Sequence, residues 1–377
     1  MKKGFTLIEL AVAVSLLAMV LAFAGAIFNV SIDTHRTAGA NAEIVQKVRA
    51  ITDQLNTDFQ GLRKDAPLLI WFQRDLTTGT RYDQIMFFAS GDFQSTRLYN
   101  IATASGPAGY GTRFPGQTGT PITGNVARIF YGQAQSRDSQ NNSIRYPYGL
   151  SEQERLLARR QHILTADEYL DRWPDASSIA NLQTSFVEEF IPGVYKNEAY
   201  EHDSLSLSRW KTLDSTAYGA LGGTIITTCF SYRALIDRAN WLAGIHNLMC
   251  EGVGSFAVQW GYLYSDPNNN ISEYRWFPSD DPDRDGFNTD SHFILMRDLP
   301  IIPAPAYANF DAFGAFFNIP GATQMNYWGS ASLMRYDPIG SFPSDFFPQA
   351  LKFTFTIYDS KGILEKGRTF THIVYLD

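Results

Sequence analysis

The chain has 377 residues, of which 45% are hydrophobic and 14% aromatic, so it can bury a large core and suits one or two domains. Its 38 acidic side chains outnumber its 31 lysines and arginines, which gives a formal net charge of −7. This balance excludes a strongly basic nucleic-acid-binding protein, and no nucleic-acid partner is expected.

The first predicted element is an apolar helix in which Glu9 is the single charged residue between Phe5 and Val30. The run is long enough to cross a bilayer at ~1.5 Å of rise per residue, whereas a cleaved secretory signal would have a shorter core and a small-residue cleavage site. Lys2 and Lys3 precede the run, which predicts a cytoplasmic N-terminus and an exported remainder. A carboxylate in hydrocarbon needs a cation, and the run holds none, so Glu9 predicts assembly inside the membrane.

The stretch GFTLIEL, residues 4–10, resembles the cleavage and methylation signature of type IV prepilins and pseudopilins. The resemblance implies that a prepilin peptidase cuts after Gly4 and methylates the new amine of Phe5. It also implies that Glu9 pairs with the Phe5 amine of a neighbouring subunit, which would supply the missing cation. The family often has a proline at the twenty-second mature position, where this chain has Ala26, so no proline kink is expected.

The helix is predicted to continue beyond the apolar run, because apolar residues recur at intervals of four, three, four, four and three. These positions are Ile44, Val48, Ile51, Leu55, Phe59 and Leu62. Pro67 is expected to end the helix, which then runs from Phe5 to about Asp65. The expected organisation is a leader at 1–4, a transmembrane helix at 5–30, its amphipathic extension at 31–66 and a β-rich domain at 67–377. An ordinary anchor with a coiled stalk would leave Glu9 unexplained.

Beyond Pro67 the pattern changes to β-strands. Short β-rich runs at 84–89 and 126–131 are bounded by turn-forming residues. The glycine-rich stretch 103–124 predicts a solvated loop, because no Gly-Lys-Ser/Thr follows it to bind a phosphate. Ser151 and Glu154 fit a helical capping box, but the residues after them also fit a strand, and we expect a strand at 157–164. Thr165 is expected to cap a short helix that Pro174 ends.

The last third of the chain predicts more strands, at 225–232, 255–264, 273–277, 351–358 and 368–376. Residues 359–367 read as a hairpin connection between the final two. Lys352, Thr354 and Thr356 alternate with three apolar residues, which predicts one exposed and one core face. The expected fold class is α+β, with a long N-terminal helix packed on an antiparallel β domain that carries insertions near 135–220 and 265–350.

Several later stretches resemble the J-class minor pseudopilin of type II secretion: LNTDF at 55–59, RLLARR at 155–160, LMCEGVGSFAVQW at 248–260, and the closing strands. The large K-class pseudopilin is a rival on size, but that class typically lacks the glutamate found here as Glu9. The resemblance implies a single-pass inner-membrane subunit with a periplasmic domain, at or near the tip of a pseudopilus that supports export of folded proteins. Its partners would be other minor and major pseudopilins, the prepilin peptidase and membrane lipid.

Two other functions fit the same N-terminal segment. One is a minor pilin of a type IV pilus or DNA-uptake filament, and the other is a bitopic surface-binding protein whose large domain captures a ligand. An enzyme is not expected, because the sequence has neither a His-Glu-x-x-His pair nor a Gly-x-Ser-x-Gly elbow.

A candidate calcium site lies in DDPDRDGFNTD, residues 280–290, and no other cofactor is expected. Asp281, Asp283 and Asp285 alternate before a glycine, and this spacing directs three carboxylates at one centre. The carbonyl of Phe287 and the side chain of Asp290 would complete the ligand set, because the twelfth position of the loop is a histidine. An acidic solvated turn fits the same residues, and both interpretations stay open.

The two cysteines, Cys229 and Cys250, lie in the segment expected outside the cytoplasm. An oxidising compartment favours a disulfide between them, whereas two buried free thiols would be equally consistent with the sequence.

Overall fold

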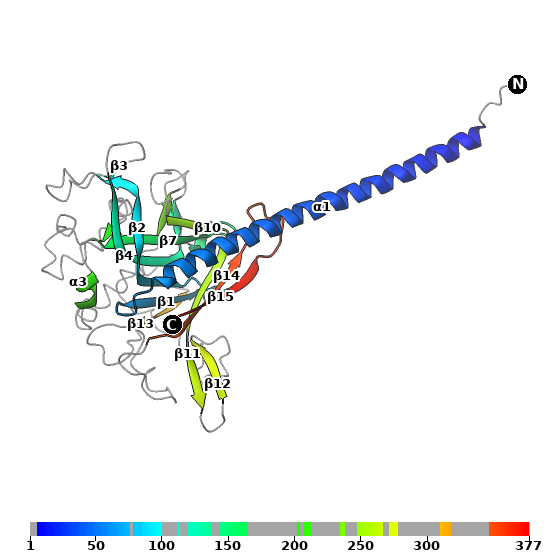
Figure 1. The fold of residues 1–377 in the computed structure, drawn as a ribbon. Coiled ribbons are helices and arrows are strands. Elements are labelled where there is room, and N and C mark those ends of the chain that lie inside the picture. The colour runs from blue at the N-terminus through cyan, green and yellow to red at the C-terminus, as the bar shows by residue number, and fades with distance from the viewer. Residues whose placement is uncertain are drawn as a thin grey trace.

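A long helix projects from a domain of β-strands in the computed structural model (Figure 1). The structure describes residues 6–75, 78–99, 112–113, 120–137, 144–145, 147–164, 202–203, 207–212, 234–237, 247–266, 271–277, 310–317 and 347–376. One half of the helix stands free of the domain, and the other half packs against antiparallel sheets. This arrangement confirms the predicted α+β class.

Helix α1 spans Leu7–Gln60, and its first buried residue is Ala40. The predicted apolar face is confirmed: Ile44, Ile51, Leu55 and Phe59 are buried, and the two remaining positions of the pattern pack against the core. The helix forms one continuous element because a single hydrophobic stripe gains a partner along the whole of its second half.

The helix ends earlier than predicted, at Gln60 and not near Asp65, because the chain joins the first sheet directly after Gly61. The Ser90 N–H donates to the Gly61 carbonyl at 2.7 Å, and the Arg63 N–H donates to the Phe88 carbonyl at 2.8 Å. A Cβ on residue 61 would lie 2.1 Å from the Ser90 carbonyl oxygen, so only glycine allows this approach.

The first sheet has the strand order β10-β7-β4-β2-β1-β13, with antiparallel pairs throughout this path. The strands are β1 (Leu68–Asp75), β2 (Gln84–Tyr99), β4 (Thr120–Gln133), β7 (Leu156–Leu164), β10 (Leu248–Glu251) and β13 (Phe310–Phe317). Short strands β3 (Thr112–Arg113) and β8 (His202–Asp203) pair with β2 and β7. The predicted strands at 84–89, 126–131 and 157–164 are confirmed.

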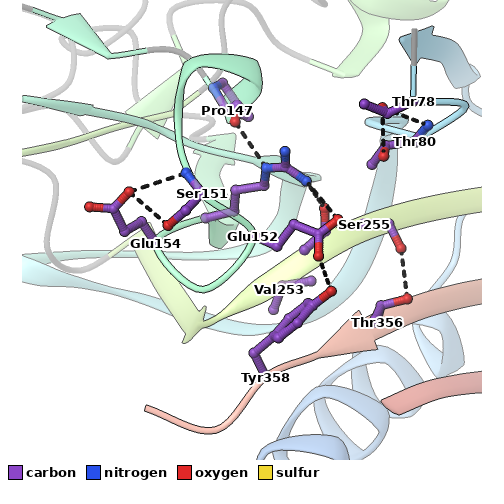
Figure 2. Close-up of polar contacts among 12 residues, drawn as sticks. Thr78, Thr80, Pro147, Ser151, Glu152, Glu154, Val253, Ser255, Thr356 and Tyr358 are labelled. Carbon is purple, nitrogen blue, oxygen red and sulfur yellow. Dashed lines mark hydrogen bonds and ion pairs between the residues drawn. The ribbon is translucent and has the colours of Figure 1, made fainter. Parts of the chain in front are cut away.

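One expectation for this sheet was wrong in part, one alternative that the sequence left open is decided, and two strands were not predicted. The predicted loop at 103–124 contains β3 and the first residues of β4, where Gly124 lies so close to β7 that a Cβ would meet Ile163 at 2.6 Å. Ser151 and Glu154 close a tight turn and not a helix: the Ser151 N–H and hydroxyl donate to the Glu154 carboxylate at 3.1 and 2.8 Å (Figure 2). Strands β1 and β13 were not predicted.

The second sheet has the antiparallel order β12-β11-β14-β15. Its strands are β12 (Ile271–Phe277), β11 (Val253–Asp266), β14 (Ala350–Ile357) and β15 (Arg368–Tyr375), which confirms four predicted strands. The hairpin connection is also confirmed: buried Asp359 accepts the N–H groups of Ile363 and Leu364 at 2.8 and 3.0 Å. The alternation on β14 places Phe353 and Phe355 in the core, as predicted.

The two sheets meet beneath α1. Phe59 of the helix stacks on Phe87 of β2 at 4.2 Å between ring centroids and contacts Phe353 of β14 at 5.5 Å. Buried Asp83 also joins the sheets, because it accepts the N–H groups of Gln73 at 2.9 Å and Val258 at 2.7 Å. Burial raises the pKa of Asp83, although the neighbouring Arg81 opposes that shift.

A small third sheet contains β6 (Ile144–Arg145), β5 (Gln135–Arg137) and β9 (Leu235–Asp237), and a 3₁₀ turn lies at Pro147–Gly149. Within the predicted insertion 135–220, helix α3 spans Leu207–Thr212, and its Lys211 pairs with Asp65 just beyond α1. Within the second predicted insertion, 265–350, lie β12, β13 and the first residue of β14. The strand expected at 225–232 and the helix expected at 165–174 lie outside the described residues.

Candidate assembly site on the N-terminal helix

The start of α1 is closed by a reciprocal pair of hydrogen bonds between Thr6 and Glu9. The Thr6 N–H and hydroxyl both donate to Oε2 of Glu9 at 2.9 Å, and the Glu9 N–H donates to the Thr6 hydroxyl at 3.3 Å. The pair forms a capping box, which satisfies N–H groups that a helix start leaves without partners. No role was predicted for Thr6, although the Thr-x-x-Glu spacing is typical of a capping box.

The cap fixes the Glu9 carboxylate at the N-terminal end of the helix, where the helix dipole also favours a negative charge. Both bonds from Thr6 end on the same oxygen, and a carboxylate offers about four lone-pair positions. The carboxylate can therefore bind an ammonium group while it keeps its cap. Gly4 and Phe5, which the sequence analysis placed at the cleavage point, lie outside the described residues.

The first half of α1 presents an apolar surface on every side. No residue of its most apolar stretch is buried against the domain, and the helix is long and apolar enough to cross a membrane. Its hydroxyl groups bond within the helix: Ser15 donates to the Ala11 carbonyl, and Thr34 donates to the Val30 carbonyl at 2.7 Å. These bonds reduce the cost of placing the hydroxyls in an apolar environment.

Two groups of contacts fix the second half of α1 to the domain, and the first involves the β14–β15 hairpin. Glu43 accepts the Ser360 N–H at 2.9 Å and its hydroxyl at 3.1 Å, and it pairs with Lys47 at 2.8 Å. Lys47 in turn donates to the Tyr358 carbonyl at 3.0 Å. Partial burial would raise the pKa of Glu43, but the bonds from Lys47 and Ser360 lower it overall.

The second group is a buried ion pair between α1 and the first sheet. Asp58, 3% exposed, accepts Nε of Arg159 at 2.6 Å on one oxygen and Nη2 at 2.7 Å on the other. Gln54 donates to the same carboxylate at 3.1 Å, and the Tyr131 hydroxyl also donates to it. Burial and then the Asp58 charge hold the pKa of Tyr131 well above its ordinary value. Asp58 lies in LNTDF and Arg159 in RLLARR. The sequence did not predict that these two stretches are in contact.

A further polar cluster joins the turn before β7 to the second sheet (Figure 2). Arg155 donates to the Pro147 carbonyl at 3.0 Å and to the Gly254 carbonyl at 2.6 Å. The Tyr358 hydroxyl donates to Glu152, and burial followed by that carboxylate raises the pKa of Tyr358 to about 12. The Arg155 side chain and the Tyr358 hydroxyl therefore connect the turn before β7 to the second sheet.

The remaining predicted sites are not tested by these contacts. Asp281, Asp283, Asp285, Phe287 and Asp290 lie outside the described residues, so the calcium site stays a prediction. Within the described part of the chain, no group of three or more His, Cys, Asp or Glu side chains could hold a metal ion.

The cysteine pair is likewise untested as a pair. Cys250 is a buried free thiol on β10, and burial raises its pKa to about 11. Cys229 lies outside the described residues, so the disulfide stays a prediction.

Comparison with known protein families gives a match at the N-terminus. Residues 1–25 match the family described as the prokaryotic N-terminal methylation motif. The chain carries a prepilin-type methylation motif. This motif implies processing by a prepilin peptidase and assembly with other pilin-like subunits. Searches of curated proteins and of solved structures found no match.

The prepilin-type motif and the apolar helix together are consistent with membrane anchoring. Proteins with this motif are generally structural and not enzymatic. The match ends at residue 25, before the β domain begins.

Proposed function

We propose that the protein is a minor pseudopilin, a structural subunit at or near the tip of a type II secretion pseudopilus. The observation that carries this proposal is the prepilin-type motif with Glu9 held at the start of an exposed apolar helix. The helix is fixed to its domain by Asp58 and Glu43, so a force on the helix is transmitted to the domain. A subunit whose helix and domain move together suits a filament that is assembled by lifting subunits out of a membrane.

The organisation of the subunit follows from this proposal. Residues 1–4 are the leader, residues 5–30 cross the inner membrane, and residues 31–66 link the membrane to the domain. The N-terminus starts in the cytoplasm, and the domain at 67–377 lies in the periplasm. The J-class assignment rests on the later sequence resemblances, two of which meet at the Asp58–Arg159 pair.

The decisive experiment is an intact-mass measurement of the protein from membranes. Removal of residues 1–4 and gain of one methyl group on Phe5 is the expected result. Gly4→Leu should leave the precursor uncut, whereas the matched variant Gly25→Leu, in open space on α1, should be processed normally. A mature N-terminus beyond about residue 20 would mean a secretory signal, and the proposal would be wrong.

A second experiment tests the role of Glu9 in assembly. A carboxylate and an ammonium ~4 Å apart attract by about 4 kcal/mol at an effective dielectric of ~20, before desolvation is counted. Glu9→Gln should therefore insert normally and yet lose cross-links to partner subunits and export of cargo. Thr6→Val is the matched control, because it removes the cap's hydroxyl but keeps the carboxylate.

The outcomes of the Glu9 experiment separate the alternatives. Normal complexes and normal export with Glu9→Gln would show that the acid is not needed, and monomeric behaviour in detergent would then favour a bitopic surface-binding protein. Lost complexes without an export defect would favour a minor pilin of a type IV pilus or DNA-uptake filament.

A further inference from the structure

Strand β15 is an outermost strand of the second sheet. It pairs with β14 through eight consecutive residues without a register shift, and on its other side no described strand pairs with it. An outermost strand of this length presents a row of N–H and C=O groups to which another strand can bind.

The backbone groups that face outward can be identified. The Leu376 N–H donates to the Gln349 carbonyl at 2.8 Å, and in an antiparallel pair the bonds to one neighbour involve every second residue. Phe370, His372 and Val374 therefore direct their N–H groups toward β14. The residues between them direct theirs away from the sheet, and these residues are Thr369, Thr371, Ile373 and Tyr375.

The strand lacks the devices that usually protect an edge. It contains no proline, bulge or inward lysine, and its single acid or base other than His372 is Arg368 at its first position. Ile373 and Tyr375 are 37% and 57% exposed. Helix α1 contacts the opposite face of β15 through the bond between Asn56 and His372 and leaves these side chains uncovered.

Aromatic side chains gather at the same end of the sheet. The Tyr375 ring meets the Tyr274 ring of β12 edge-on at 5.8 Å, and Tyr274 stacks beside Trp276 at 5.9 Å. Trp276 lies against Gly261, where a Cβ would be 2.8 Å from its ring. A strand added beside β15 would bury apolar surface next to this cluster as well as pair its backbone.

The direction of β15 restricts which strand can be added. Contacts of α1 and the residues after it advance with the chain through β15: Glu43 meets Ser360 before β15, Asn56 meets His372 within it, and Lys64, just after α1, meets Leu376 just after β15. The strand and the helix therefore run in the same direction. A symmetric antiparallel pair of β15 strands would point the two helices in opposite directions, which two copies anchored in one membrane cannot do.

We propose that the edge of β15 is a docking site for an outer β-strand of a neighbouring pilin-like subunit anchored in the same membrane. The incoming strand adds to the sheet by backbone hydrogen bonds and places apolar side chains beside Ile373 and Tyr375 and polar ones beside Thr371. This inference rests on the proposed function, because the neighbour and its orientation come from assembly through α1.

The test compares Thr371→Pro with Thr371→Val in the full chain, co-expressed with the other chains that carry the same N-terminal motif. Proline removes an N–H that points away from β14, so the ladder bonds and the unfolding midpoint should be preserved, whereas valine keeps the N–H. We expect at least about a five-fold loss of cross-linked complexes with proline and none with valine.

Amide hydrogen exchange gives a second measurement that does not depend on a variant. In the detergent-solubilised monomer, the N–H groups of Phe370, His372 and Val374 should be protected and those of Thr371 and Ile373 should exchange quickly. In the assembled complex, all five should be protected. Fast exchange at Thr371 and Ile373 in the complex would overturn the inference, even if Thr371→Pro failed to fold.

The outcomes also separate this inference from the function on which it rests. Equal complex formation by the proline and valine variants would overturn the docking site and leave the proposed function standing. A processed wild-type chain that formed no complexes at all would overturn both.

Discussion

The Asp58–Arg159 pair offers the sharpest test of how α1 is held on its domain. Asp58→Asn keeps the size of the side chain but removes the negative charge that accepts two hydrogen bonds from Arg159, at 2.6 and 2.7 Å. Breaking a buried ion pair by removing one partner typically costs 3–5 kcal/mol, roughly. The Arg159 side chain is 20% exposed, so water compensates part of the loss, and we expect about 3 kcal/mol.

The measurement is the free energy of unfolding in urea, followed by near-ultraviolet circular dichroism of the aromatic core. Asp58→Asn, Arg159→Gln and the double variant form a cycle that isolates the pairwise term. We expect a coupling energy above about 1.5 kcal/mol, because the second substitution removes the partner that the first left unpaired. Asp53→Asn, exposed on the same helix, should change stability by less than about 0.5 kcal/mol.

Additive single effects would refute this reasoning. If the double variant lost the sum of the two single losses within about 0.5 kcal/mol, the two side chains would be acting independently. The position of α1 would then depend on the apolar stripe and the hairpin contacts alone.

Three more predictions concern His372, Gly61 and the two cysteines. Burial lowers the pKa of His372 in the folded protein below its ordinary 6.5. The free energy of unfolding should therefore be highest above pH 6.5, and it should fall as the pH drops from 6.5 through the lower pKa of the folded state. His372→Gln should flatten this dependence in unfolding titrations, and an unchanged slope would contradict it. Gly61→Ala should lower the free energy of unfolding in urea by more than about 2 kcal/mol, whereas Gly39→Ala, at an uncrowded position of α1, should raise it slightly. If Cys229 and Cys250 are bridged, the unreduced protein should resist alkylation and lose roughly 3 kcal/mol on reduction; full labelling of both native thiols would exclude the bridge.

Elements with a local pattern could be predicted from the sequence. The stripe at Ile44, Ile51 and Leu55 repeats every turn, and the alternation of β14 between threonine and phenylalanine repeats every second residue. Both periods survive because one face of each element is buried and the other is not.

Features without a local pattern were missed. Leu68, Ile70 and Phe72 of β1 are fully buried, as is Leu69 between them, so the strand shows no alternation that would distinguish it from a helix. The Asp58–Arg159 contact joins residues that lie far apart in the chain, and no pattern in either stretch indicates that the two residues pair. Gly61 gives a helix stop only because β2 lies against it, and that is a property of the folded chain.

The exposed stretch of α1 at residues 33–39 determines the orientation of the domain relative to the apolar first half of the helix. The domain turns with the helix, because Ala40 and the residues after it are held by the sheets. Each residue of an α-helix advances the direction of a side chain by about 100° and the height by ~1.5 Å. One residue more or fewer in this stretch would therefore rotate the whole domain by about 100° around the axis of α1 relative to the apolar segment, while the apolar segment and the core stayed unchanged. The length of the stretch 33–39 therefore acts as an angular setting, and it decides which way the edge of β15 faces relative to the apolar segment.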